Sequence, residues 1–292
     1  MSKIVIEGSR FWDISRLCMR IQGDGKLEVT EEELEAMKLK EIPTVYVASN
    51  QSDIGFVAEM EDGIVVAFKG TDNFNDFITD INITLTDLKP YGPVHSGFYN
   101  AVSEIGPKMI NQIKTMLKEL PPEKQMLYIV GHSKGGAMAT VFSCQAKQIT
   151  DNLRVITYGS PRVASKTFAQ NYNLENYAYV SFLDIVPHLP ITGKERELIK
   201  RQSPVYSASA PILNLMEFFP IGKRIDIYVE RNSNGEYNRF PYIHLPKQQN
   251  NASGETLNSW CAIEWLLRDL KTELINEIHN GDYETITTTV IE

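Results

Sequence analysis

Apolar positions in the first quarter of the chain are spaced in a way that predicts short strands. The apolar runs cover residues 45–49, 54–60 and 64–68. Asp62-Gly63 lies between the last two runs and suits a tight hairpin turn, so we expect a small β-meander. Two helices precede it: one over 9–21, and a shorter one that opens at the capping box formed by Thr30 and Glu33.

Beyond the meander, patterns typical of strands and of helices alternate. Helices are expected over 98–119 and 134–148, and strands over 126–130, 153–158, 177–182 and 224–229. An amphipathic helix is expected over 263–278, whereas 70–95 and 190–222 look irregular, the latter as loops around a site. Alternation of this kind predicts an α/β fold with a mainly parallel central sheet and helices on both faces. No linker divides the chain, so we expect a single domain over 1–292.

Composition and charge narrow the class of protein. The 292 residues are 42% hydrophobic and 23% charged, which excludes a disordered chain or a small disulfide scaffold. The net charge of −8 argues against nucleic acid as a partner, because phosphate binding needs a basic surface. A lipid interface stays compatible with this charge, since apolar contact can suffice there. The oligomeric state is left open.

The cysteines and the N-terminus bear on the compartment. Three widely spaced cysteines form neither a disulfide framework nor a zinc motif, so we expect reduced thiols. Residues 1–10 lack the long apolar segment of a signal peptide, and no apolar run is long enough for a transmembrane helix. A cytoplasmic location is therefore expected, or export by a route that needs no signal peptide.

The segment 128–137 carries the most informative motif, Gly131-x-Ser133-x-Gly135. An apolar strand leads into the motif and a helix of small residues follows it, which is the setting of a nucleophile elbow. In such an elbow the serine is strained and the glycines relieve crowding, while the helix N-terminus stabilises negative charge. We therefore predict Ser133 as a nucleophile.

Asp184 is the best candidate for the acidic partner of Ser133. It follows the strand predicted over 177–182, and active sites of α/β proteins gather where parallel strands end. In catalytic triads on this kind of sheet, the acid comes after the serine and before the histidine along the chain.

Five stretches together resemble the fungal-type (class 3) lipase family of the α/β-hydrolases. They are residues 66–71, 94–98, 131–136, 158–163 and 184–190. The resemblance covers roughly 45–230 and implies a serine esterase that hydrolyses lipid esters, such as acylglycerols or phospholipids, at a membrane or lipid-droplet surface. It supports Ser133 as nucleophile and Asp184 as the triad acid, and implies that no metal or cofactor is needed.

The resemblance also implies an oxyanion hole built from the backbone amides of Thr71 and Lys134. This sequence departs from the family at two positions in or near the proposed oxyanion hole. Lys134 stands where the family usually has a hydrophobic residue, so its cation is expected near the acyl site, and Lys69 stands where arginine is frequent. Neither change removes an amide donor, so the chemistry is expected to be retained.

The general base is the open question. His95, His132 and His188 are expected to be structural, which leaves His244 and His279. We predict His244, because a loop past Asp184 can deliver an imidazole, whereas His279 precedes Asn280-Gly281 and resembles a helix C-terminus. Absence of any base is the third possibility, and it would make the chain a lipase-like binding or scaffold domain. Another acyl-transfer enzyme on the same fold, such as a thioesterase, is a further alternative.

The segment 74–80 is expected to act as a lid over an apolar acyl groove. Phe74, Phe77 and Ile78 would form one apolar face of a short helix there. In relatives, the corresponding segment follows the oxyanion residue. An amphipathic loop helix with no lid motion is the simpler alternative. Phe218 and Phe219 are expected either to line a pocket or to pack in the core.

Overall fold

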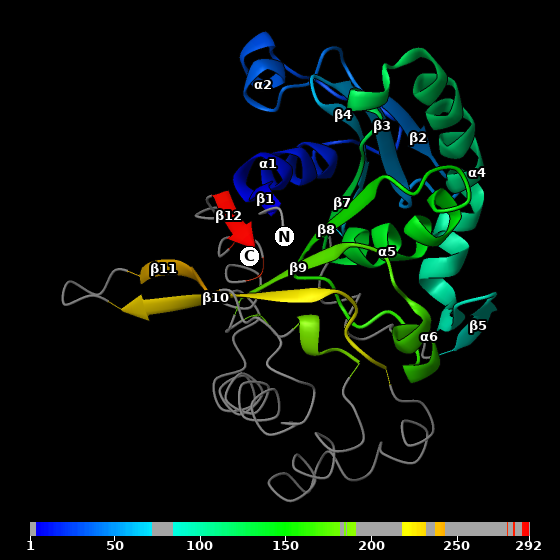
Figure 1. Cartoon of the computed structure of the whole chain (residues 1–292), viewed down its shortest axis with the longest axis vertical. Helices are drawn as coiled ribbons and strands as arrows, with labels where there is room; N and C mark the ends of the chain where they lie inside the picture. The colour runs from blue at the N-terminus through cyan, green and yellow to red at the C-terminus, as the bar shows by residue number, and fades with distance from the viewer. Residues whose placement is uncertain are drawn as a thin grey trace, which may run out of the picture.

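The computed structural model describes a mixed β-sheet in the middle of the chain (Figure 1). Described are residues 4–71, 84–181, 184, 186–190, 218–231, 237–242, 279, 283 and 288–291. The strands of this sheet are β2 (Thr44–Val47), β3 (Ile54–Met60), β4 (Gly63–Phe68), β7 (Leu127–His132), β8 (Leu153–Tyr158), β9 (Asn176–Ser181), β10 (Lys223–Arg231) and β11 (Tyr237–Tyr242). Their spatial order is β11-β10-β9-β8-β7-β4-β3-β2.

The direction of the strands confirms the α/β prediction. β4, β7, β8, β9 and β10 run parallel to their neighbours in the order given, which brings their carboxyl ends to one edge. β2, β3 and β4 pair antiparallel and form the expected N-terminal meander. Polar side chains placed just after β7 and β9 therefore meet at one edge of the sheet.

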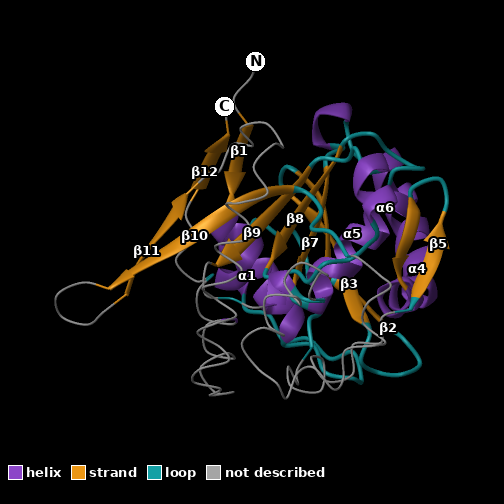
Figure 2. Cartoon of the chain, turned by 90° about the horizontal axis from the view of Figure 1, so that it is seen from below, coloured by secondary structure: helices purple, strands orange, loops and turns teal. Residues whose placement is uncertain are grey.

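Helices cover the two faces of the sheet (Figures 1 and 2). The helices are α1 (Gly8–Met19), α2 (Glu31–Ala36), α4 (Ser96–Glu119), α5 (Lys134–Ala146) and α6 (Lys166–Asn171), with single 3-10 turns at η1 (Pro122–Lys124) and η2 (Val186–His188). Val66 and Phe68 of β4 join the hydrophobic cluster of α4 and α5, whereas Val65 and Ala67 join the cluster of α1. Successive residues of a strand point to opposite faces, so α1 lies on the face opposite α4 and α5.

Local signals explain where several helices begin. Thr30 and Glu33 form the predicted capping box at α2. At α4 the His95 side chain accepts a hydrogen bond from Gly97 N, so the helix starts at Ser96 despite Pro107 in its interior. His95 is therefore structural, as predicted.

Four features differ from the sequence predictions. Residues 70–95, expected to be irregular, contain the antiparallel pair β5 (Leu85–Leu88) and β6 (Gly92–His95). Residues 240–242, expected in the loop that carries His244, belong to strand β11. Helix α6 was not predicted either. The fourth feature is a two-stranded sheet that pairs β1 (Ile4–Glu7) with β12 (Thr288–Ile291) near the two ends of the chain. Strands this short and this far apart in sequence leave too weak a local pattern to be predicted.

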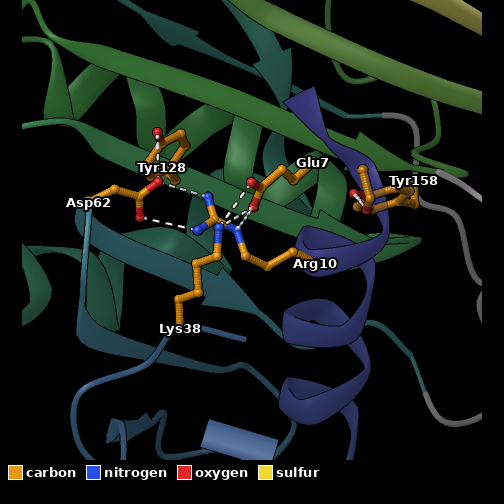
Figure 3. Close-up of polar contacts among 7 residues, drawn as sticks. Glu7, Arg10, Lys38, Asp62, Tyr128 and Tyr158 are labelled. Atoms are coloured by element: carbon orange, nitrogen blue, oxygen red, sulfur yellow. Dashed lines mark hydrogen bonds and ion pairs between the residues drawn. The ribbon is translucent and has the colours of Figure 1, made fainter. Parts of the chain in front are cut away.

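The N-terminal helix is fixed to the meander by a group of charged side chains (Figure 3). Arg10 is 6% exposed and donates through Nη1 and Nη2 to the carboxylate of Asp62, at 3.2 and 2.9 Å. Glu7 Oε2 lies 3.0 Å from Arg10 Nε, and Glu7 also accepts from Lys38 Nζ at 2.9 Å. These contacts join the start of α1 to the β3–β4 turn, so α1 has a defined position on the sheet.

Some predicted segments lie outside the described residues. They are the lid candidate 74–80, most of the loop region 190–222 and the C-terminal helix 263–278. Among the helices that the structure describes, none is long and apolar enough to cross a membrane.

Candidate active site

Ser133 occupies a strained turn between β7 and α5. Its backbone angles are φ 56° and ψ −129°, a conformation that non-glycine residues rarely adopt. A hydrogen bond from Ser133 N to Tyr158 O, at 2.9 Å, fixes the turn against β8. The side chain stands at the carboxyl edge of the sheet, and the residue is 2% exposed. These are the features of the predicted nucleophile elbow.

The glycines of the motif are required by close packing. A Cβ at Gly131 would lie 2.2 Å from Gly135 O, and a Cβ at Gly135 would lie 2.1 Å from Phe68 O at the end of β4. Both distances are far below any real contact, so neither position accepts a side chain. The first turn of α5 thereby lies directly against β4 and β7.

Asp184 follows β9 and lies almost completely buried, at 1% exposure. Its Oδ1 accepts a hydrogen bond from Val186 N at 2.9 Å, and its own amide donates to Ser181 O at 3.2 Å. The carboxylate is therefore held by the backbone of the turn that follows the strand, at the predicted place.

The imidazole that contacts Asp184 belongs to His279. Its Nδ1 lies 2.8 Å from Asp184 Oδ2, and the Tyr283 hydroxyl donates to the same oxygen at 2.6 Å. His244 is the base predicted from the sequence, with His279 as the alternative, and this geometry favours His279 instead. His244 lies outside the described residues. Among the described residues, the Asp184 carboxylate accepts hydrogen bonds from His279, Tyr283 and the backbone amide of Val186.

Gly159 leaves space for the side chains of Asp184, His279 and Tyr283. It follows β8 with φ +53°, and a Cβ there would lie 2.6 Å from Asp184 Oδ2, 2.8 Å from His279 Cε1 and 2.9 Å from the Tyr283 hydroxyl. A glycine is needed both for the backbone angle and for the space. Because His279 lies so close to Gly159, it stands against the carboxyl end of β8. The last residue of that strand, Tyr158, accepts a hydrogen bond from the Ser133 amide.

His132, next to the nucleophile, packs against His279 and holds it in place. Its ring lies 4.4 Å from the His279 ring between centroids, and its Nε2 lies 3.0 Å from the His279 carbonyl oxygen. Because a carbonyl only accepts, His132 Nε2 carries the proton. Burial, helped by the nearby His279, lowers the pKa of His132 well below 6.5, so this ring is neutral near pH 7.

Helix α1 packs against His132 and against Tyr283. The Trp12 ring packs on His132 at 5.1 Å and on Tyr283 at 5.3 Å between centroids. Tyr158 lies in the same aromatic group and donates from its hydroxyl to Gly8 O at 2.6 Å. The positions of His132 and Tyr283 therefore depend on α1.

The proposed oxyanion donors belong to segments that adjoin the nucleophile. Lys134 is the first residue of α5, and Thr71 follows Gly70, whose Cβ would lie 3.4 Å from Ser133 Cβ. The Lys134 ammonium is ion-paired with Asp53, and both side chains are largely buried. The cation that the sequence analysis placed near the acyl site is thus neutralised by a carboxylate that precedes β3.

The remaining candidates pack in the core. His188 lies in η2 and is 1% exposed, which agrees with its predicted structural role. Phe218 is equally buried and contacts the His95 ring. Within the described ranges, no group of three or more His, Cys, Asp or Glu residues is arranged to hold a metal ion.

Comparison with known sequences agrees with the site. Residues 65–194 match the family described as Lipase (class 3). The lipase of Rhizopus niveus is 28% identical over 198 residues, covering 64% of this chain and 46% of that protein. Secreted mono- and diacylglycerol lipase 1 of Fusarium solani is 32% identical over 132 residues, or 44% of this chain and 39% of that protein. The chain thus spans less than half the length of both relatives.

Comparison with solved structures supports the fold. The native propeptide complex of Rhizomucor miehei lipase superimposes with a TM-score of 0.60 at 20% identity, covering 81% of this chain and 73% of that one. The shared architecture is the α/β-hydrolase fold, as predicted.

Proposed function

Since residues 65–194 belong to the class 3 lipase family, we propose that this chain is a serine hydrolase that cleaves carboxylic esters of lipids. The observation that carries the proposal is the contact of His279 Nδ1 with Asp184 Oδ2 at 2.8 Å, beside a serine in an elbow. A paired histidine and aspartate at the edge where a strained serine stands make up the parts of a catalytic triad. The alternative of a lipase-like binding domain rested on the lack of a base, and His279 now supplies a candidate.

In the proposed reaction, the Ser133 hydroxyl attacks the acyl carbon and His279 Nε2 takes its proton. The Asp184 carboxylate accepts from His279 Nδ1, which leaves Nε2 unprotonated and able to act as base. The amides of Thr71 and Lys134 stabilise the oxyanion, each contributing about 10²–10³ in kcat. His279 then returns the proton to the leaving alcohol, and water repeats the sequence to release the fatty acid and Ser133.

Lipid esters are the proposed substrates because the relatives that match are named lipases, one of them a mono- and diacylglycerol lipase. Acylglycerols and phospholipids share the acyl ester that this chemistry cleaves. Such substrates aggregate in water, so we propose that the enzyme meets them at a membrane or lipid-droplet surface. Turnover of a long-chain ester should then rise when it is offered in vesicles or emulsions instead of below its solubility limit.

A two-part experiment tests the proposal. A fluorophosphonate probe should label wild type at Ser133, as located by peptide mapping, and p-nitrophenyl esters from acetyl to palmitoyl should be hydrolysed. Ser133→Ala should lose both labelling and turnover. The matched control is Ser143→Ala, a buried serine on the same helix that donates to Thr140 O, and it should keep both. Equal turnover by wild type and Ser133→Ala on every ester would refute the proposal.

A further inference from the structure

The loop that carries one of the proposed oxyanion donors is attached to the end of helix α1. The helix ends at Met19, and the Met19 Sδ accepts a hydrogen bond from Gly70 N at 3.0 Å. The buried Lys69 ammonium donates to Ile21 O at 2.7 Å, two residues after the helix end. Two successive residues before Thr71 are therefore bound to the same short segment of chain.

Gly70 is packed closely between this segment and the nucleophile. A Cβ at Gly70 would lie 2.8 Å from His132 O, 3.1 Å from Met19 Sδ and 3.4 Å from Ser133 Cβ. On its other side, the backbone of Lys69 donates to Ile54 O at 2.9 Å. The Met19 thioether is therefore one of the groups that confine Gly70, together with the backbone of His132 and the side chain of Ser133.

We propose that Met19 is a positioning residue for the oxyanion hole: its sulfur fixes the Gly70 amide and thereby aims the next amide, that of Thr71, at the developing oxyanion. The inference rests on the proposed function, because it assigns the Thr71 amide to that hole. Met19 lies before the part of the chain that matches the lipase family, which begins at residue 65.

The surroundings of Met19 distinguish this role from simple packing. Met19 lines a cavity of about 700 Å³ together with Trp12, Leu17, Met37 and His132. A side chain that borders a cavity on one side has room to change rotamer. Packing alone therefore does not fix the position of the Met19 sulfur. A substitution that removes the sulfur leaves the Gly70 amide without this acceptor.

The test compares three variants. Met19→Leu removes the acceptor and keeps an apolar side chain, Met19→Gln supplies a carbonyl acceptor on a chain of similar length, and Met37→Leu is the matched control in the same cavity. An interaction expressed only in the transition state changes kcat and leaves KM unchanged. Misaiming one oxyanion donor should cost less than losing it, so we expect Met19→Leu to lower kcat about tenfold. Met19→Gln should recover part of this loss, and Met37→Leu should match wild type.

Amide hydrogen exchange gives a readout that needs no activity. The Gly70 amide should be protected in wild type and should exchange at least several-fold faster in Met19→Leu, but not in Met37→Leu. Unchanged exchange at Gly70, or a kcat for Met19→Leu within twofold of wild type, would overturn the role of Met19. Failure of the proposed function itself would appear differently, as equal turnover by wild type and Ser133→Ala, and the exchange result would then still decide whether Met19 fixes the loop.

Discussion

His279 donates from Nδ1 to Asp184 Oδ2 across 2.8 Å, and this contact joins residues 95 positions apart in the chain. Both side chains are almost fully buried. A buried carboxylate without a partner would be costly, so the pair stabilises the turn after β9 as well as orienting the imidazole. The same oxygen accepts from Tyr283, four residues after His279.

Removing the Tyr283 hydroxyl should lower both kcat and stability, because this hydroxyl donates to Asp184 and accepts from Ser181 N. In Tyr283→Phe, Asp184 Oδ2 loses one of the two donors that the described residues provide, and it orients His279 less firmly. Because a hydrogen bond to a charged group is worth about 1.5–3 kcal/mol, kcat should fall about tenfold or more. Steady-state kinetics on a p-nitrophenyl ester measures this.

Tyr158→Phe is the comparison for that variant. Its hydroxyl is equally buried but donates to Gly8 O, on α1. This variant should lose stability and, because α1 supports His132 and Tyr283 only indirectly, should lower kcat much less than Tyr283→Phe. If both variants lost activity equally, the contact of Tyr283 with Asp184 would have no special role.

Gly159→Ala should abolish turnover in a protein that still folds. The added methyl group would meet Asp184 Oδ2, His279 Cε1 and the Tyr283 hydroxyl, all within 3 Å, so the pair must separate. Gly222→Ala is a matched substitution, since Gly222 also has positive φ (+98°) and its Cβ would lie 2.6 Å from Asn176 Oδ1. Both variants should melt at lower temperature in calorimetry, but only Gly159→Ala should be inactive below its melting range. Full activity of Gly159→Ala would contradict the described geometry.

Acid should destabilise the fold through His132. Burial holds the pKa of native His132 well below 6.5, so below pH 6.5 the unfolded chain binds a proton there that the folded chain does not. Stability is therefore fully present above pH 6.5 and is lost as pH falls below it, by at most about 1.4 kcal/mol per pH unit.

Urea unfolding at pH 7.5 and 5.5 measures this contribution. His132→Gln should be less stable than wild type at pH 7.5 and should lose less stability between the two pH values. An identical pH dependence in both proteins would exclude His132 as the titrating group.

The charged contacts at the start of α1 should contribute measurably to stability. Arg10→Met keeps the aliphatic stem but leaves Glu7 and Asp62 without their shared guanidinium. Since the Arg10 side chain is 7% exposed, we expect a loss of about 1–3 kcal/mol in the free energy of unfolding. Lys26→Met breaks the exposed pair with Asp24 and should not change stability measurably in the same urea titration. Equal effects of the two substitutions would show that burial of Arg10 does not matter.

Much of the site could be predicted because its signals are local. Ser133 is marked by glycines two residues away on each side, of which Gly131 is required by contacts within the elbow and Gly135 by the close approach to Phe68 O. Asp184 is marked by its position after a strand. The strands β3, β4, β7 and β8 were recognised because they are almost entirely buried and therefore largely apolar.

The base could not be chosen with the same certainty, because no local pattern fixes where His279 lies relative to Asp184. Its position depends on long-range contacts: the ring of His132, and the pairing of β12 with β1 a few residues later. One signal was available. His279 and Tyr283 are four residues apart, a spacing that places two side chains on one helix face, and both contact Asp184. The Asn280-Gly281 pair, however, is typical of a helix end and so favoured a structural role for His279.

The identity of the base tests the account most directly. Turnover of p-nitrophenyl butyrate should be measured for wild type, His279→Ala and His244→Ala, with circular dichroism to confirm that each variant is folded. The account predicts that His279→Ala loses at least about 10³-fold in kcat, as expected for a member of a catalytic triad, whereas His244→Ala stays near wild type. The reverse result, with His244→Ala inactive and His279→Ala active, would contradict the assignment of His279 as the partner of Asp184 and Ser133.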